Sequence, residues 1–238
     1  MQELIVDSTP EKGKVWSMQG YNIVAVDVLR ATSTIVVALE RGAKEVIPCA
    51  EVAEAETFRG QPGILLAGER KGEMIPGFDF TNSPDDLSRE ELSGKCIVLT
   101  TSDGTRLITQ ASDAEVVFAA STLNHEAVAA AILEFGGNWA LIGAGSSGDF
   151  RPEDKVGCAL VGKTLLESGY FRKNEGLDAF IREFTTNWAS IILNSLSVQK
   201  LHKIGRAADV KFVIEKTNMY RSTPRVVKRG NLVTIQNI

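Results

Sequence analysis

The sequence predicts an α/β protein whose sheet is mostly parallel or mixed and carries helices on both faces. Short β-rich apolar runs alternate with segments of helical periodicity, which is the pattern of a sheet covered by helices. The 238 residues are 44% hydrophobic and 24% charged, which is enough apolar mass for a sizeable core. No low-complexity tract or linker divides the chain. We therefore expect a single domain over residues 1–238.

A strand, a helix and a second strand are predicted in the first quarter of the chain. YNIVAVDVL (21–29) is a β-rich apolar run, and RATSTIVVALERG (30–42) has helical periodicity with a terminal glycine. Thr32 or Ser33 can cap the start of this helix. AKEVIPC (43–49) reads as the next strand, so the three segments predict a βαβ unit.

The same pattern returns later and predicts an internal duplication. CIVLTTSDGT (96–105) is a strand that runs into a turn, RLITQAS (106–112) a short helix, and DAEVVFAAS (113–121) the next strand. The two copies suggest similar halves, at about residues 1–95 and 96–238.

The remaining elements follow in order. NWALIGAG (138–145) predicts a buried strand, followed by a glycine turn and a helix from about Pro152 to Ser168. Residues 177–205 have one long helical pattern. The chain then continues through VKFVIE (210–215) to PRVVKRGNLVTIQ (224–236), which predicts a hairpin with its turn at Arg229-Gly230-Asn231.

One segment fits neither period. GERKGEMIPGFDFTNSP (68–84) opens a long connection to about residue 94 with little expected regular structure, and such loops are usually functional or disordered. Ile75, Phe78 and Phe80 would be exposed in a free loop, so we expect them to pin it against the sheet.

Composition limits the possible partners and compartment. A net charge of -4 and a pI near 5.4 argue against nucleic acid, so any anion site must be local. No secretory signal or long apolar run is present, which predicts a cytoplasmic protein without a membrane partner. Cys49, Cys96 and Cys158 have neither disulfide nor zinc spacing, so we interpret them as small core residues.

Two hydroxyl-rich turns follow predicted strands, at the sheet edge where α/β proteins bind ligands. Asp27 is followed by Arg30, Thr32 and Ser33 at the start of a helix, whose N–H groups favour anions. Residues 101–105 occupy the equivalent place; they are Thr101, Ser102, Asp103, Gly104 and Thr105. The alternative is structural, with the hydroxyls acting only as helix caps and turn formers.

The irregular loop adds further polar candidates. Glu69 beside Arg70 suits a metal or a water on one side and an anion on the other, because a guanidinium can bind an anionic group through two hydrogen bonds. A solvated ion pair between them is the alternative. Asn82 and Ser83 add neutral donors.

Gly143, Gly145 and Gly148 form a GxGxxG pattern directly after a predicted strand, which is the pattern of a dinucleotide site. Pro152 delays the helix beyond the glycines, and no strand ending in an acid follows about 20 residues on, so this interpretation is weak. An NAD(P)-binding oxidoreductase is kept as an alternative function. Glu153 and Asp154 suit the first helical turn without any metal.

Several long motifs in order over nearly the whole chain resemble the 2-phosphosulfolactate phosphatase family. They are DVLRATST (27–34), GERKGEMIPGFDFTNSP (68–84), TTSDGT (100–105), GAGSSG with PED (143–154) and HKIGRAADV (202–210). The resemblance implies a magnesium-dependent phosphatase that hydrolyses 2-phosphosulfolactate to 3-sulfolactate and phosphate, a step in coenzyme M synthesis. It also implies an α/β fold with two related halves.

The resemblance assigns roles to the candidates. Asp27, Glu69 and Asp154 are expected at or near Mg²⁺, and Arg30 and Arg70 as anion clamps. Asp27, Glu69 and Asp103 form the expected catalytic set, and the remaining substrate contacts are Thr32, Ser33, Asn82, Ser83, Thr101, Ser102, Gly104 and Thr105. The loop at 68–84 then forms a wall of the active site.

The chain departs from the family at Asp103, where asparagine is usual, and an added carboxylate there would alter metal affinity or repel an anion. Attack by water and a covalent aspartyl-phosphate on Asp27 are both open. The expected partner is a small polyanionic phosphate ester, and a homodimer is left open. A non-catalytic small-anion-binding protein is the remaining alternative.

Overall fold

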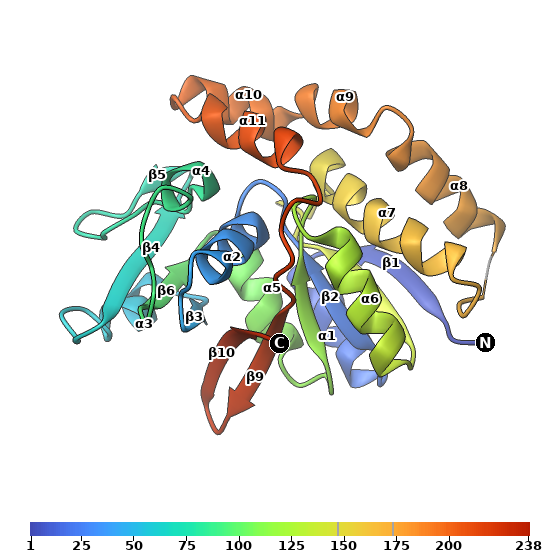
Figure 1. Cartoon of the computed structure of the whole chain (residues 1–238), viewed down its shortest axis with the longest axis horizontal. Helices are drawn as coiled ribbons and strands as arrows, with labels where there is room; N and C mark the ends of the chain where they lie inside the picture. The colour runs from blue at the N-terminus through green and yellow to red at the C-terminus, as the bar shows by residue number, and fades with distance from the viewer. Residues whose placement is uncertain (147, 173) are drawn as a thin grey trace.

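The protein folds around a ten-stranded mixed sheet with helices on both faces (Figure 1), which confirms the predicted fold class. The computed structural model describes residues 1–146, 148–172 and 174–238. The strands are β1 (Leu4–Ser8), β2 (Asn22–Val26), β3 (Glu45–Cys49), β4 (Ile64–Arg70), β5 (Glu73–Met74), β6 (Cys96–Thr100), β7 (Val117–Ala120), β8 (Trp139–Gly143), β9 (Pro224–Arg229) and β10 (Leu232–Asn237).

The helices connect these strands and then form a separate run near the end of the chain. They are α1 (Pro10–Met18), α2 (Ala31–Glu40), α3 (Val52–Glu56), α4 (Pro84–Leu87), α5 (Gly104–Ala111), α6 (His125–Phe135), α7 (Pro152–Glu167), α8 (Glu175–Thr185), α9 (Trp188–Leu193), α10 (Leu196–Lys203) and α11 (Ala207–Glu215). In the described part of the chain, no helix combines the length and the apolar character needed to cross a bilayer.

The sheet consists of two groups of parallel strands joined by an antiparallel hairpin. Its order is β1-β8-β2-β7-β9-β10-β3-β6-β4-β5. The first four strands are mutually parallel, as are β3, β6 and β4, and the β9–β10 hairpin pairs with β7 on one side and β3 on the other. The hairpin joins each neighbouring strand through a single residue pair. Phe118 of β7 pairs with Arg225 of β9, and Ile235 of β10 pairs with Val46 of β3.

The predicted βαβ unit at 21–49 has the right elements but was wrong in its arrangement. Strands β2 and β3 are not neighbours, because α2 carries the chain from one parallel group to the other. Helix α5 makes the opposite crossing, from β6 to β7. Strands buried on both faces carry no sequence signal that identifies their neighbours. The division into related halves at about residue 95 stays a prediction.

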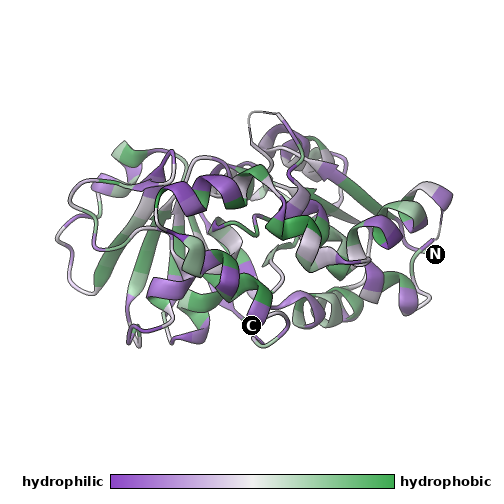
Figure 2. Cartoon of the chain, turned by 90° about the horizontal axis from the view of Figure 1, so that it is seen from above, coloured by the Kyte–Doolittle hydropathy of each residue, from purple (hydrophilic) through white to green (hydrophobic). Residues whose placement is uncertain are grey.

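Alternate residues of the central strands enter different cores. In β2, Ile23 and Ala25 pack in a cluster with α2 and α5, whereas Val24 and Val26 pack in a cluster with α6 and α7. This two-residue alternation buries both faces of the sheet. Figure 2 shows strands that are largely hydrophobic and helices that carry both hydrophilic and hydrophobic segments.

The long helical pattern at 177–205 is divided into α8, α9 and α10, so the prediction of one helix was wrong. Asn187 adopts a left-handed conformation with φ 53° between the first two helices. The Ser195 side chain accepts a hydrogen bond from the N–H of Val198 and starts α10. Helices α8–α11 run along the upper side of the molecule in Figure 1, before the chain descends to the hairpin.

The irregular segment at 68–84 is more ordered than its composition indicates. Strand β4 continues through Arg70, turns at Lys71 and Gly72 with φ 57° and 88°, and pairs with β5. Ile75 and Phe78 are buried, and Phe80 packs against the core, as predicted. The segment is therefore pinned against the sheet.

The remaining predictions at this level are confirmed with one exception. The hairpin, its turn at Gly230 and the helix that starts at Pro152 form as expected. Cys49 and Cys158 are buried, whereas Cys96 is only half-buried and its thiol contacts Glu45.

Candidate active site

A cavity of about 720 Å³ lies where residues after β2, β4, β6 and β8 meet one face of α10. It is lined by both acidic and basic side chains, contributed by both groups of parallel strands. The acidic ones are Asp27, Glu69, Asp103, Glu153 and Asp154, and the basic ones are Arg30, Lys71, Arg106, Arg151, Lys200 and Lys203. The site therefore has concentrated charge of both signs.

Hydroxyl groups fix the turn after β2. The N–H of Asp27 donates to Thr32 Oγ1 (2.9 Å), and that hydroxyl donates to the Asp27 carbonyl (2.8 Å). The Ser33 hydroxyl donates to the Val28 carbonyl (2.8 Å). Asp27 Oδ1 accepts from the N–H of Ala31 (3.2 Å), so α2 begins directly at this carboxylate. Both hydroxyls donate to carbonyls that precede α2, and no side-chain cap hydrogen bond forms at its start, so the capping role considered for Thr32 and Ser33 was wrong.

The turn after β6 is built in a similar way. Thr101 and Thr105 exchange hydrogen bonds between their N–H groups and hydroxyls, at 3.1 and 3.2 Å. Gly104 opens α5 so close to α2 that an added Cβ would lie 2.3 Å from Asp27 Oδ2 and 2.5 Å from Ala31 Cβ. Glycine at 104 therefore allows the two helix starts to meet.

Glu69 organises the loops around the cavity. Its Oε1 accepts from the N–H and the hydroxyl of Ser102 (2.8 and 3.0 Å), and its Oε2 accepts from the N–H of Gly72 (2.6 Å). The side chain is 7% exposed. Glu69 thus ties the end of β4 to the turn after β6.

Two carboxylates come from the first turn of α7. Asp154 accepts from the N–H of Val28 (3.0 Å) and, with its other oxygen, from the N–H of Gly145 (3.1 Å). A dinucleotide pyrophosphate at the GxGxxG turn would compete with this carboxylate and be repelled by it. Glu153 is 2% exposed, and its buried Oε2 has no hydrogen-bond partner among the described residues.

The crowding of these carboxylates changes their titration. Burial, together with the negative charges of Asp103 and Glu69, raises the pKa of Asp27 to about 7. Burial and then the charge of Asp27 raise the pKa of Asp154 well above its ordinary value. Burial also raises the pKa of Asp103, against the opposing charge of Arg106. All three shifts would be reduced by a cation in the cavity.

Arg70 does not line the cavity. It follows Glu69 within β4, and successive strand residues point to opposite faces. Its guanidinium donates to the carbonyls of Glu69 (2.7 Å) and Ala50 (3.3 Å) and to Thr100 Oγ1 (2.9 Å). The assignment of Arg70 as an anion clamp stays a prediction, but these contacts support a positioning role.

Arg30 does line the cavity but is paired. Its Nη1 donates to Asp209 Oδ2 of α11 at 2.9 Å, with the two side chains only 3% and 1% exposed. Ser83 also bonds to Asp209, outside the cavity, whereas Asn82 lines it. The pair anchors α11 to the start of α2.

The structure brings about half of the predicted residues together. Those that line the cavity are Asp27, Arg30, Glu69, Asn82, Thr101, Ser102, Asp103 and Asp154, and those that do not are Thr32, Ser33, Arg70, Ser83, Gly104 and Thr105. Sequence reasoning missed Glu153 and five cations: Lys71, Arg106, Arg151, Lys200 and Lys203. The position of Arg151 directly after the glycine turn was a usable signal, whereas the lysines of α10 had none.

The donor set fits a magnesium ion held by few protein ligands. Among the described residues, no three His, Cys, Asp or Glu side chains are arranged to enclose a metal. Mg²⁺ in phosphoryl-transfer sites is usually held by one or two carboxylates, with substrate and water oxygens completing its shell. The unpartnered Glu153 oxygen and the raised pKa of Asp27 are what such an ion would satisfy.

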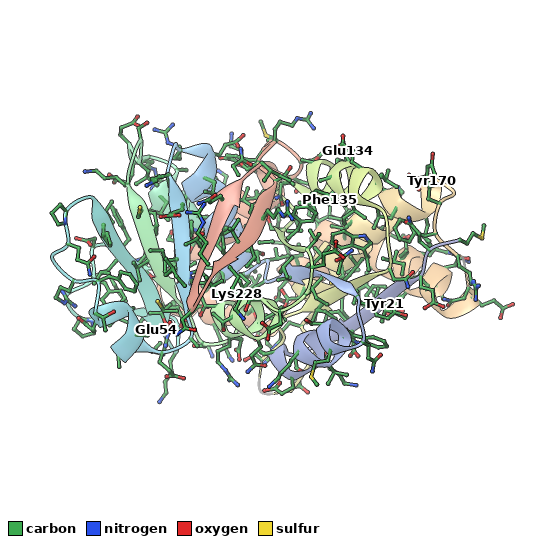
Figure 3. All side chains as sticks on the ribbon, turned by 90° about the horizontal axis from the view of Figure 1, so that it is seen from below. Tyr21, Glu54, Glu134, Phe135, Tyr170 and Lys228 are labelled. Atoms are coloured by element: carbon green, nitrogen blue, oxygen red, sulfur yellow. The ribbon has the colours of Figure 1, made fainter. Side chains whose placement is uncertain are left out.

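A second, smaller cavity of about 290 Å³ lacks this chemistry. Glu54 and Lys228 both line it, and Figure 3 shows their places beside the hairpin, seen from below. Its other lining is mostly apolar or neutral. The larger cavity is therefore the candidate active site.

An α/β fold with a charged cavity at strand ends is the architecture of an enzyme for a small anionic substrate. The family model for 2-phosphosulpholactate phosphatase matches residues 5–228. The chain belongs to this family.

Three relatives named "probable 2-phosphosulfolactate phosphatase" illustrate the match. The protein of Carboxydothermus hydrogenoformans is 33% identical over 227 residues, covering 94% of this chain and 93% of the relative. That of Thermotoga petrophila is 35% identical over 204 residues (86% and 88%), and that of Caldanaerobacter subterraneus subsp. tengcongensis 34% over 199 residues (81% and 83%).

Proposed function

We propose that this chain hydrolyses 2-phosphosulfolactate to 3-sulfolactate and inorganic phosphate, with Mg²⁺ as its cofactor. The observation that carries the proposal is a cavity lined by buried carboxylates together with arginine and lysine side chains, in a chain of this family. An acidic protein can hold a polyanion only where cations are concentrated locally. A place in coenzyme M synthesis is part of the same proposal.

We propose that Asp27 and Glu153 hold the metal. Each has a carboxylate oxygen without a hydrogen bond from the described residues, Oδ2 of Asp27 and Oε2 of Glu153. When bound, Mg²⁺ would neutralise charge on the phosphoryl oxygens. Glu69 and Asp154, also expected near the metal, use both oxygens on backbone or hydroxyl donors, which supports a positioning role for them.

The cavity arginines would bind the phosphoryl group. Arg151 lines the cavity, and its Nη2 donates to the Ser146 carbonyl (3.2 Å). A guanidinium held by one hydrogen bond can orient a phosphoryl oxygen with its remaining donors. Leu201 and Ile204 of α10 line the same cavity and would restrict access of bulk water.

Release of inorganic phosphate from 2-phosphosulfolactate, measured with and without Mg²⁺, tests the proposal. We expect release that requires Mg²⁺, and a Glu153→Gln variant that needs more Mg²⁺ or is inactive, because an amide is a weaker ligand for a hard cation. Glu175→Gln is the matched control, since Glu175 occupies the first turn of α8 and is exposed. Binding of 3-sulfolactate without any turnover would instead identify a non-catalytic anion-binding protein.

A further inference from the structure

One wall of the cavity is a single face of α10. Ser197, Lys200, Leu201, Lys203 and Ile204 line it, at spacings that place them on one side of a helix. The carboxylates that line the cavity come from other elements, together with Arg30, Lys71, Arg106 and Arg151. Helix α10 therefore adds two lysines and no carboxylate to the lining.

The two lysines of this face have no carboxylate to neutralise them. In the part of the chain that the structure describes, the lysines in ion pairs are Lys12, Lys163, Lys211 and Lys228. Neither Lys200 nor Lys203 lies within ion-pair distance of an acidic side chain. Both therefore present a positive charge that is available to a ligand.

A favourable interaction with the helix dipole explains why basic residues occupy the last turn of α10. It does not explain why the two lysines among them line the cavity. That turn holds Lys200, His202 and Lys203, and all three would interact with the dipole. Only the two lysines line the cavity, whereas His202 does not. The direction of the lysines thus needs a second cause.

Helix α10 is held firmly enough to place these charges. The following helix α11 is fixed by the buried pair of Arg30 and Asp209 and by Arg206 with Asp86 at 2.6 Å. The end of α10 touches the turn after β4, because an added Cβ on Gly72 would lie 2.8 Å from Ile204 Cδ1. These contacts hold the backbone of α10 beside the cavity.

We infer that Lys200 and Lys203 bind the sulfonate of the substrate and determine the preference for it. This rests on the proposed function, in which the phosphoryl group lies toward the carboxylates and their metal. A second strong anion on the same three-carbon frame is kept away from the phosphoryl group by mutual repulsion and is attracted to the unpaired lysines of α10. A lysine ammonium, with three rotatable donors, suits the three oxygens of a sulfonate.

Both the sulfonate and the carboxylate of the substrate could bind a lysine. The test therefore compares two substrates, of which only one carries the sulfonate. The assay compares kcat/KM for 2-phosphosulfolactate and for 2-phospholactate, which keeps the carboxylate and lacks the sulfonate. We expect the wild type to prefer the sulfonate, and Lys200→Gln/Lys203→Gln to lower the ratio about ten-fold, mainly through KM. Lys211→Gln on α11 is the control and should leave the ratio unchanged. An unchanged ratio in the double variant would overturn the inference.

Calorimetric binding of 3-sulfolactate and lactate tests the inference without turnover. The wild type should bind 3-sulfolactate more tightly, with an affinity that falls as salt rises, and the double variant should lose about ten-fold in affinity and most of the salt dependence. This result would support the inference even in a protein that releases no phosphate, where only the proposed function fails. Equal affinity of wild type and double variant for 3-sulfolactate would refute it.

Discussion

Replacing Asp209 with asparagine should lower the free energy of unfolding by about 3 to 5 kcal/mol, because the change leaves Arg30 charged and unpaired in the interior. Asp209 Oδ2 accepts from Arg30 Nη1 at 2.9 Å, and the N–H of Asp85 and the hydroxyl of Ser83 contact the other oxygen. The substitution keeps the size of the side chain but removes its charge. The loss is a large part of the roughly 5 to 15 kcal/mol that stabilises an ordinary domain.

The burial of the pair determines this magnitude. Arg30 and Asp209 are 3% and 1% exposed, so water cannot replace the lost partner. The same helix offers a contrast in Arg206, which pairs with Asp86 at 2.6 Å but with side chains 33% and 38% exposed. Arg206→Gln should therefore cost less than about 1 kcal/mol.

Urea unfolding followed by circular dichroism at constant pH measures both variants against the wild type. The double variant Arg30→Met/Asp209→Leu should regain part of the stability lost in Asp209→Asn, because no buried charge is then left unpaired. An Asp209→Asn protein within 1 kcal/mol of wild type would refute the reasoning. A loss in Arg206→Gln as large as that in Asp209→Asn would refute it as well.

Further substitutions test other parts of the site and fold. Arg151→Lys should lower kcat/KM by about ten- to hundred-fold, and Arg70→Lys by less, since only Arg151 faces the cavity; steady-state kinetics that rank them in reverse would contradict the geometry. Gly104→Ala should destabilise the fold by about 1 to 3 kcal/mol in urea unfolding, because the added methyl group has no room. Asp103→Asn introduces the residue expected from the family resemblance; because burial raises the pKa of Asp103, the variant should be at least as stable as wild type at neutral pH while KM or the Mg²⁺ requirement changes, and unchanged kinetics would place residue 103 outside the site. Burial lowers the pKa of His125, so the unfolded chain takes up a proton first as pH falls below about 6.5, and this residue's contribution to stability is lost there; in unfolding measured from pH 7 to 5, the stability of His125→Asn relative to wild type should rise as pH falls.

The sequence predicted the structure best at positions where local chemistry determines the backbone conformation. Buried strands followed by hydroxyl-rich turns pointed to Asp27, Thr101, Ser102 and Asp103, which line the cavity, because polar side chains at strand ends lie at the edge of the sheet where α/β proteins bind ligands. The hairpin and the start of α7 depend on glycine and proline at fixed positions, and both formed as expected.

Whether a side chain points toward a distant part of the molecule could not be predicted in the same way. The irregular composition after residue 68 concealed the end of β4, so the two-residue alternation that sends Arg70 away from the cavity was not applied. Lys200 enters the site only because residues 177–205 break at Asn187 and Ser195, which turns α10 across the cavity. Periodicity alone does not indicate the breaks at Asn187 and Ser195, since the apolar pattern continues through them.

The hairpin in the middle of the sheet has a consequence for the order of folding. Strands β9 and β10 come after the other described strands in the chain, yet within the described sheet the pairing between the two parallel groups runs through them. No segment before residue 224 can therefore complete the sheet, and α2 and α5 must already have crossed between groups that are not yet joined. Such a topology depends on contacts between distant residues and favours slow folding with a late, cooperative closure.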